Sequence, residues 1–412
     1  MPPTDTVIIG AGHAGLAMSR CLADRDVRHV ILERGNVGER WRTARWDSFR
    51  LLTPNWLSRL PGRRYTGPDP DGFMSAGEFA RHLDDYARSF DAPVRPHTLV
   101  TRVDHAAGGF AVHTDHGVWS ARSVVIATGY HSRATVPELA TGLAPDVAQL
   151  TAAGYRSPSS LPEGAVLVVG GSASGVQIAD ELVHAGRRVV LAVGGHTRVP
   201  RRYRGRDILW WLDRIGSLDR TIDDVPDPAR ATAEPSLQLA GRTDGRSVDL
   251  AVLRRAGVRL VGRLRALDGT TAEFAGDLPA TVGAAQRRLD RLLARIDAYA
   301  DGTPGTSAGP PDPPPVITVH GGPSRMDLRR AGISAVVWAT GYQPWYPWLK
   351  VPVLDAGGRL HHRRGVTGVP GLYAIGLRFQ YRRNSTFIDG ARHDAAHLAD
   401  EITAHRAVRV GV

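Results

Sequence analysis

The residues best suited to chemistry are the glycines of the stretch VIIGAGHAG, Val7 to Gly15. Gly10, Gly12 and Gly15 have the spacing G-x-G-x-x-G, in which missing side chains allow a tight turn, a close approach of backbone to a pyrophosphate, and close packing of the next helix. Glu33 follows at the end of the next apolar run, where an acid can bind a ribose hydroxyl. The pattern predicts a dinucleotide site.

A second glycine turn begins 160 residues beyond the first, in the stretch AVLVVGGSASG. Gly170 and Gly175 hold the outer positions, while Ser172 replaces the middle glycine. A serine lets the backbone approach less closely, but its hydroxyl can bond a phosphate, as can that of Ser174. We therefore predict a second dinucleotide site here.

The strand after the second turn ends in Val-Gly-Gly, residues 193–195, without a carboxylate. Arginines follow at once, at Arg198, Arg201 and Arg202. A missing acid beside arginines is typical of a site that accepts a 2'-phosphate. This pattern favours NADPH over NADH and makes the three arginines candidate phosphate ligands.

The elements that must position these turns follow from the apolar periodicity. Strand, turn, helix and strand are expected around each turn, with short strands over 94–128, an amphipathic helix over 75–90, and a second helix over 283–300 before a proline-rich linker. The tetrapeptide Ala-Thr-Gly-Tyr ends two apolar strands, at 127–130 and 339–342. We expect the chain to cross between domains there and to approach a cofactor through Ala127, Thr128, Gly129, Thr340 and Gly341.

Composition narrows the class of protein. The chain has 412 residues, a formal charge of +11 and 42% hydrophobic residues, values that suit a globular protein of two or three domains. The single cysteine, Cys21, excludes disulfide-exchange chemistry.

No leader or membrane-spanning run is evident, and the arginines lack interleaved aromatics, so we expect a cytoplasmic protein that binds neither membrane nor nucleic acid. His393 and His397 lack a third ligand, and no metal site is expected.

Taken together, the motifs VIIGAGHAG, ERWR, WDSFRLLTPNW, VLVVGGSASG, RVPRRYRGRD and FIDG resemble, in this order, the class B flavoprotein monooxygenases. The bacterial branch often labelled as flavoproteins involved in potassium transport is especially similar. The resemblance implies an α/β fold of two nested dinucleotide-binding, Rossmann-like domains. An FAD domain of residues 1–155 and 335–412 would be interrupted by an NADPH domain of residues 156–334.

The same resemblance implies a reaction and its residues. Gly10, Gly12, Gly15 and Glu33 would hold the adenosine diphosphate half of FAD. Trp41 and Arg42 would lie near the flavin, and Asn55 would offer its amide beside flavin C4a. Hydride transfer from NADPH, addition of O2 and transfer from a C4a-(hydro)peroxide would then oxygenate a small organic nucleophile at nitrogen, sulfur or carbon.

Two positions depart from the family pattern. Within Pro145 to Tyr155, where the family has F-x-G-x-x-x-H-x-x-x-W/Y, Thr151 replaces the histidine and only Tyr155 is kept. Threonine cannot take the charge or acid-base role of histidine, which argues against Baeyer-Villiger chemistry. Leu377 follows Gly376 where related reductases have aspartate, so Asp389 becomes the candidate to hold the ribityl chain.

Other functions remain open on the sequence alone. One alternative is an NADPH-oxidising flavin oxidase or reductase that transfers no oxygen to substrate. Another is a non-enzymatic sensor that binds flavin without turnover. The expected partners are a small-molecule substrate and O2, and a homodimer is expected only from base rates.

Overall fold

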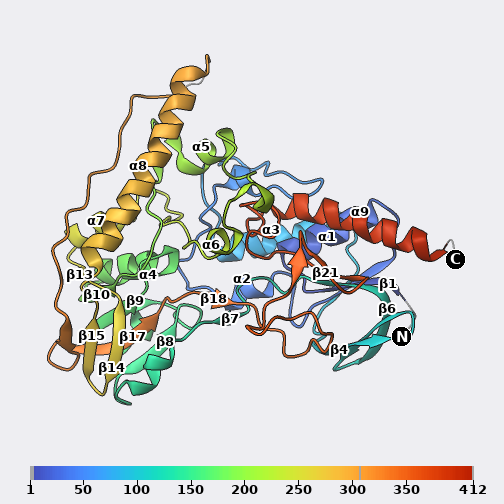
Figure 1. Ribbon diagram of the computed structural model, residues 1–412, viewed down its shortest axis with the longest axis horizontal. Coiled ribbons are helices and arrows are strands. Elements are labelled where there is room, and N and C mark those ends of the chain that lie inside the picture. Colours follow the sequence, from blue (N-terminus) through green and yellow to red (C-terminus); the bar gives the residue numbers. More distant parts are fainter. Residues whose placement is uncertain (1–3, 306–307, 411–412) are drawn as a thin grey trace.

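The computed structural model describes residues 4–305 and 308–410, which form two β-sheets joined by paired linkers (Figure 1). The first sheet has the strand order β19-β20-β21-β6-β1-β2-β3, with β5 and β4 extending from β6. Its strands are β1 (Thr4–Ile9), β2 (His29–Leu32), β3 (Val94–Arg95), β4 (Val100–Ala106), β5 (Gly109–Thr114), β6 (Gly117–Ile126), β19 (His362–Arg363), β20 (Val366–Thr367) and β21 (Leu372–Ala374).

The second sheet is parallel, with the order β13-β10-β9-β17-β8. Its strands are β8 (Ala148–Thr151), β9 (Ala165–Val169), β10 (Val189–Ala192), β13 (Arg259–Val261) and β17 (Ile333–Trp338). The smaller sheets pair β14 (Leu264–Asp268), β15 (Thr271–Phe274) and β16 (Arg325–Asp327), β11 (Arg202–Tyr203) with β12 (Arg206–Asp207), and β7 (Arg133–Ala134) with β18 (Tyr342–Gln343).

The helices cover these sheets and the space between them (Figure 1). They are α1 (His13–Ala23), α2 (Glu39–Thr43), α3 (Ala76–Arg88), α4 (Ala173–His184), α5 (Ile208–Arg214), α6 (Pro228–Thr232), α7 (Leu250–Arg255), α8 (Leu278–Gly302) and α9 (Ala391–Val410). Within the described residues, none is long and apolar enough to cross a membrane.

Strands β1 and β6, at the centre of the first sheet, are buried on both faces. Val7 pairs with Val124 and Ile9 with Ile126 on one face, Ile8 pairs with Val125 on the other, and all six are 5% exposed or less. Runs of β-branched residues without polar alternation are typical of such parallel strands. One face is covered by α1 and α9, which lie side by side because α9 buries Ala391, Ala395, Leu398, Ala399 and Ile402 at helical spacing (Figure 1).

The sheet order corrects the expected domain boundaries. The boundary expected at 155 falls after β8, and the one expected at 335 falls inside β17, yet both strands belong to the second sheet. The inserted unit therefore runs from β8 to β17. The mixture of helix and sheet agrees with the predicted α/β class, and the two nested units agree with the predicted architecture.

The two Ala-Thr-Gly-Tyr segments are where the chain leaves each sheet, as expected. The first follows β6 and the second follows β17, and the linkers then pair, with Tyr342 opposite Ala134. The Thr340 hydroxyl donates to the carbonyl of Thr135 in the other linker. Thr340 thus fastens the two crossings to each other.

The expected helices form, with physical reasons visible at their ends. At α3, the Ser75 hydroxyl accepts from the Glu78 amide and the Glu78 carboxylate accepts from the Ser75 amide, which is a capping box. The helix expected over 283–300 extends at both ends into α8, and its buried Leu289, Leu293 and Ile296 pack with α5. The proline-rich stretch that follows forms neither helix nor strand in its described part.

A buried acid in α9 makes stability depend on pH. Asp394 is 1% exposed, and burial raises the pKa of its carboxyl to about 7, opposed by Ser385 and Arg382. The native chain therefore holds this proton more tightly than the unfolded chain. Stability falls as pH rises from about 4 to about 7 and stays lower above that range.

We expect Asp394→Asn, which mimics the protonated acid, to raise the free energy of unfolding at pH 8 by about 1–3 kcal/mol. At pH 4 the effect should nearly vanish, because the native carboxyl is protonated there. Urea unfolding at the two pH values measures this difference. An equal effect at both values would contradict the prediction.

Candidate cofactor and substrate site

The first glycine turn combines tight packing with one open position. Gly10 has φ +108°, and a Cβ added there would lie 2.7 Å from the Ala127 carbonyl oxygen. A Cβ on Gly15 would overlap the Gly10 carbonyl. Gly12 has nothing within 4 Å of an added Cβ. Gly10 and Gly15 therefore serve packing, whereas Gly12 leaves room for a ligand at the start of α1.

A cavity of about 330 Å³ opens beside this turn. Glu33 lies in its wall, and its carboxylate accepts hydrogen bonds from the amides of Ala11 at 2.7 Å and Gly35 at 3.1 Å. Each oxygen keeps a lone pair for a further donor. The sequence-predicted residues that the structure brings together here are Gly10, Gly12, Glu33, Trp41, Ala127, Thr128 and Gly129.

Three buried polar atoms of this cavity have no hydrogen-bond partner among the described residues. They are His13 Nε2, Thr128 Oγ1 and Arg45 Nε. A buried polar group without a partner costs free energy, and native proteins nearly always satisfy such groups. These atoms therefore indicate that a polar ligand completes the cavity.

The second turn repeats the same geometry. Gly170 has φ +117°, and a Cβ on it would overlap the Ala339 carbonyl, while one on Gly175 would overlap the Gly170 carbonyl. Ser172 is the N-cap residue of α4, but its hydroxyl accepts no capping hydrogen bond from the helix. Ser174 lines a second cavity, of about 1170 Å³. Each Ala-Thr-Gly segment thus packs on its own glycine turn.

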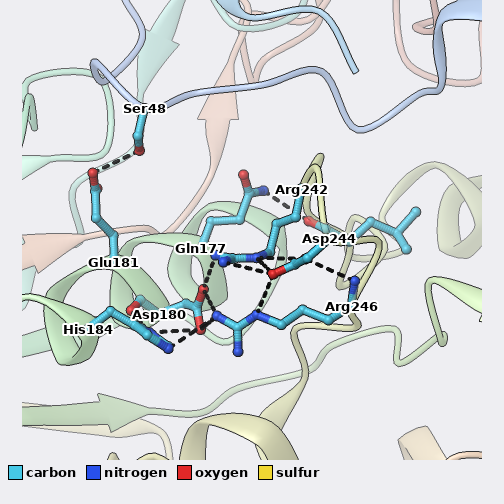
Figure 2. A network of polar contacts seen from close by, with 9 residues as sticks. Ser48, Gln177, Asp180, Glu181, His184, Arg242, Asp244 and Arg246 are labelled. Carbon is cyan, nitrogen blue, oxygen red and sulfur yellow. Dashed lines mark hydrogen bonds and ion pairs between the residues drawn. The ribbon is translucent and has the colours of Figure 1, made fainter. Parts of the chain in front are cut away.

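Polar contacts along α4 hold this helix at the second turn (Figure 2). Asp180, which is 3% exposed, accepts from Arg242 at 2.9 Å and from Arg246 at 3.1 Å. On the next residue, the Glu181 carboxylate accepts from the Ser48 hydroxyl at 2.7 Å, which ties α4 to the first domain. Gln177, which lines the larger cavity, donates to the Leu239 carbonyl at 3.0 Å. The middle and the C-terminal half of α4 are therefore fixed relative to both domains.

The two cavities share a wall. The residues that line both of them are His13, Trp41, Arg45, Tyr130, His131 and Thr386. A group bound in the smaller cavity can therefore reach a group bound in the larger one at this junction.

Arg45 is the charged residue that lines both cavities, and it is absent from the site residues predicted from the sequence. Its guanidinium carbon lies 4.9 Å from the ring centroid of Trp41 and 5.2 Å from that of Phe49. Among residues 4–305 and 308–410 it forms an ion pair with no carboxylate. Burial lowers the pKa of Arg45. The spacing of Trp41 and Arg45, four residues apart, was the available signal, because it suits an aromatic-cation contact.

The two histidines of the junction are neutral at physiological pH. Burial lowers the pKa of His13 to about 4. Burial, together with the charges of Arg45 and Arg40, lowers the pKa of His131 to about 3. Neither imidazole can serve there as a proton-donating cation, although both can form hydrogen bonds.

The structure corrects the expected place of Asn55. Its Nδ2 donates to the Asp69 carbonyl at 2.8 Å and its Oδ1 accepts from the Met74 amide at 2.9 Å. Asn55 is 4% exposed and lines neither cavity. It holds the chain of residues 69–74, while Leu52 and Thr53 of the same segment face the larger cavity.

Arg42 and Asp389 are also placed away from the cavities. Arg42 turns outward to an ion pair with Asp84 at 2.5 Å. Asp389 is buried between Arg59 at 2.6 Å and Arg392 at 2.9 Å, so its carboxylate is already neutralised. Neither residue lines the junction. The sequence pattern predicted that both residues lie near the flavin, but their side chains point to their ion-pair partners instead.

Of the three arginines expected to bind a phosphate, Arg198 lines the larger cavity but is paired with a carboxylate, Arg201 is buried in an ion pair, and Arg202 lies on the surface. Arg198 is 2% exposed and pairs with Asp249 at 2.7 Å, and Arg201 is 1% exposed and pairs with Asp207 at 2.5 Å. Arg202, in β11, is exposed and lines neither cavity. Thr340 and Gly341 lie in the linker, also outside both cavities.

Arg288 of α8 is the arginine that the structure brings to the glycines after β10. It lines the larger cavity and donates to the His196 carbonyl at 2.6 Å, next to Gly195. The sequence held no local signal for this residue, because α8 follows β10 by 86 residues and reaches it only through packing.

We expect Gly12→Ala to fold normally and to lose bound flavin. The backbone there has φ −77°, which alanine accepts, and the added methyl meets no protein atom but would occupy the space needed by a pyrophosphate. The flavin-to-protein absorbance ratio and thermal unfolding of the apoprotein measure the two effects. Gly15→Ala is the matched control, which should destabilise the apoprotein itself. Full flavin content in Gly12→Ala would contradict the assignment.

Comparison with known proteins agrees with this geometry. Residues 7–208 match the family model described as pyridine nucleotide-disulphide oxidoreductase. The chain is 32% identical over 404 residues to an uncharacterized CzcO-like oxidoreductase from Geobacillus kaustophilus, covering 97% of this chain and 99% of that protein. It is 25% identical to the probable indole-3-pyruvate monooxygenase YUCCA4 from Arabidopsis thaliana, covering 96% and 89%.

A solved structure shares the fold. The flavin-containing monooxygenase from Stenotrophomonas maltophilia superposes with a TM-score of 0.68 at 20% identity, covering 98% of this chain and 99% of that one. The CzcO-like relative confirms the predicted enzyme class, an oxidoreductase, and the matched pyridine-nucleotide family and the flavin monooxygenase fold agree with the predicted cofactors, FAD and NADPH. The chain therefore belongs to the family of the CzcO-like oxidoreductases, which agrees with the predicted resemblance to the class B flavoprotein monooxygenases.

Proposed function

We propose that this flavin monooxygenase transfers an oxygen atom to a small organic nucleophile at the junction of its two cavities. The observation that carries the proposal is the shared wall, where a flavin from the smaller cavity would meet a nicotinamide and a substrate from the larger one. The shape and the polar atoms of both cavities fit these occupants.

The smaller cavity suits FAD. Gly12 offers open backbone at the start of α1, and Glu33 has free lone pairs for a ribose. The unpartnered atoms of His13, Thr128 and Arg45 would gain partners from the cofactor. Bound FAD supplies the hydride acceptor and the means of activating O2.

The chain itself contributes a dry and positively charged setting. Trp41, Trp46 and Phe49 form an aromatic wall of the larger cavity, and cation–π contacts with Trp41 and Phe49 hold Arg45 against it. The positive charge of Arg45 would stabilise negative charge that develops nearby, an effect that is stronger in a desolvated site than in water. The neutral His13 and His131 add hydrogen-bonding groups without adding charge.

The larger cavity suits NADPH, with a different arginine from those first expected. Ser172 and Ser174 lie at the start of α4, where backbone amides favour a pyrophosphate. Arg288 is proposed to bind the 2'-phosphate, because it lies beside the carbonyl of His196 and lines the cavity with Gly195. Arg198 and Arg201 are already neutralised by carboxylates.

The position of Thr151 supports oxygenation without the signature histidine. Thr151 ends β8, pairs with Trp338 and lines neither cavity. Because the side chain at this position lines neither cavity, its replacement need not remove a group that contacts substrate. Whether Thr151 in place of the histidine changes the type of reaction is a question that kinetic measurements would answer.

We expect NADPH oxidation to be coupled to oxygenation when a suitable substrate is present. Peroxide released per NADPH oxidised would be measured with and without an amine, a sulfide and indole-3-pyruvate, the last chosen from the names of the plant relatives. Support would be a lower peroxide yield together with an oxygenated product. One peroxide per NADPH with every compound would favour the oxidase, and absence of flavin reduction would favour the sensor.

We expect Arg288→Gln to raise KM for NADPH about tenfold and to leave KM for NADH almost unchanged, because a charge-assisted hydrogen bond to the 2'-phosphate contributes about 1.5–3 kcal/mol. Arg287→Gln is the matched control, since Arg287 neighbours Arg288 on α8 but is exposed and lines neither cavity. Equal changes in both KM values would refute the assignment.

A further inference from the structure

The larger cavity carries far more positive than negative charge. Nine arginines and a single carboxylate, Glu234, occur among the described residues of its lining. Two of these arginines are neutralised, Arg198 by Asp249 and Arg383 by Glu234, each at 2.7 Å. The other seven form ion pairs with no carboxylate in the described part of the chain.

NADPH accounts for only part of this charge. Its pyrophosphate and 2'-phosphate together carry about four negative charges at neutral pH. They would lie at the start of α4 and beside Arg288, near the second glycine turn. An excess of about three positive charges would remain with the cofactor bound, by the same phosphate charges.

The remaining arginines lie away from that turn. Arg295 is seven residues beyond Arg288, which is about two turns or 10 Å along α8. It donates to the Ser217 hydroxyl at 3.2 Å, just after α5, and Arg220 follows in the same segment. Figure 1 shows this direction, because α8 starts beside α7 and rises toward α5. Arg291 lies between, on the same face of the helix.

Apolar residues accompany these arginines. Leu212, Leu218, Leu292 and Phe387 line the same cavity. Leu292 lies four residues after Arg288 and three before Arg295, so the lining face of α8 alternates guanidinium groups with an apolar side chain. This end of the cavity therefore offers both a cationic and an apolar contact surface.

We propose that the substrate is an organic acid with an apolar body, whose carboxylate is held by Arg220, Arg291 and Arg295. The inference rests on the proposed function, since it names the substrate class of the same site. Guanidinium groups bind carboxylates through paired hydrogen bonds, and a cavity of one charge sign attracts an oppositely charged ligand from solution. A cationic amine would meet repulsion throughout this cavity.

Ligand binding tests the proposal without any need for turnover. Calorimetry on the oxidised holoenzyme would compare 3-phenylpropanoate with two neighbours of similar shape, the neutral 3-phenylpropanamide and the cationic 3-phenylpropylamine. We expect the acid to bind at least tenfold more tightly than the amide, and the amine to bind more weakly still. Equal or tighter binding of the amide or the amine would overturn the proposal.

A charge-reversal pair then tests the arginines. Arg295→Glu should weaken binding of the acid at least tenfold, leave binding of the amide unchanged, and leave the Kd of NADP+ within twofold of the wild type. Arg287→Glu is the matched control, because it makes the same charge change on the same helix outside the cavity. It should change the Kd of neither the acid nor NADP+.

The outcomes separate this inference from the proposed function. A Kd for NADP+ that rises in Arg295→Glu while the acid binds normally would assign Arg295 to the cofactor and overturn the proposal. Tight and Arg295-dependent binding of the acid, in an enzyme that releases one peroxide per NADPH, would uphold the anion site while refuting oxygen transfer.

Discussion

The close approach of a glycine turn to the end of a neighbouring strand is the constraint on which both halves of this structure depend. A side chain on Gly10 would press on the Ala127 carbonyl, and one on Gly170 would overlap the Ala339 carbonyl. The side chain at each strand end also faces the last glycine of its turn, since an added Cβ would lie 3.3 Å from Ala127 Cβ at Gly15 and 3.5 Å from Ala339 Cβ at Gly175, so a small residue such as alanine suits both strand ends. Immediately after these contacts the chain passes between domains, so the two turns, the two strand ends and the two linkers form one arrangement. The paired linkers β7 and β18 then bring both turns to a common cavity system.

The features that depend on local pattern could be predicted from the sequence. The glycine turns, the strands around them, the helix at α3 and the acid Glu33 each follow from residues within one short segment. Side-chain direction could not be predicted in the same way. Asn55 is turned by the carbonyl of Asp69 and the amide of Met74, and Asp389 is turned by Arg59, 330 residues earlier in the chain.

The sequence also does not show which arginines are paired with carboxylates in the folded chain. Arg198, Arg201 and Arg288 have the same side chain, but carboxylates neutralise the first two, whereas Arg288 lines the larger cavity and forms no ion pair among the described residues. Which arginine is neutralised depends on where Asp249 and Asp207 fold, and the sequence pattern of the strand end carries no information about that. A buried ion pair also costs the free energy of desolvation of both charges, so these two arginines would not readily leave their partners for a phosphate.

The junction can be formed before ligands bind because the inserted unit is fastened to the first domain at several places. Besides the paired linkers, the segment after α5 lies against the chain before α9, where the amide of Ile222 donates to the Tyr381 carbonyl at 2.7 Å and that of Arg383 donates to Arg220 at 2.9 Å. Ion pairs join the same segments, between Asp219 and Arg382 and between Glu234 and Arg383. Partly exposed ion pairs contribute little to stability, typically below about 1 kcal/mol. Their effect here is on position. Glu234, the one acid among the described residues that line the larger cavity, joins the two domains through Arg383, which leaves the remaining positive charge of the cavity available to anionic ligands.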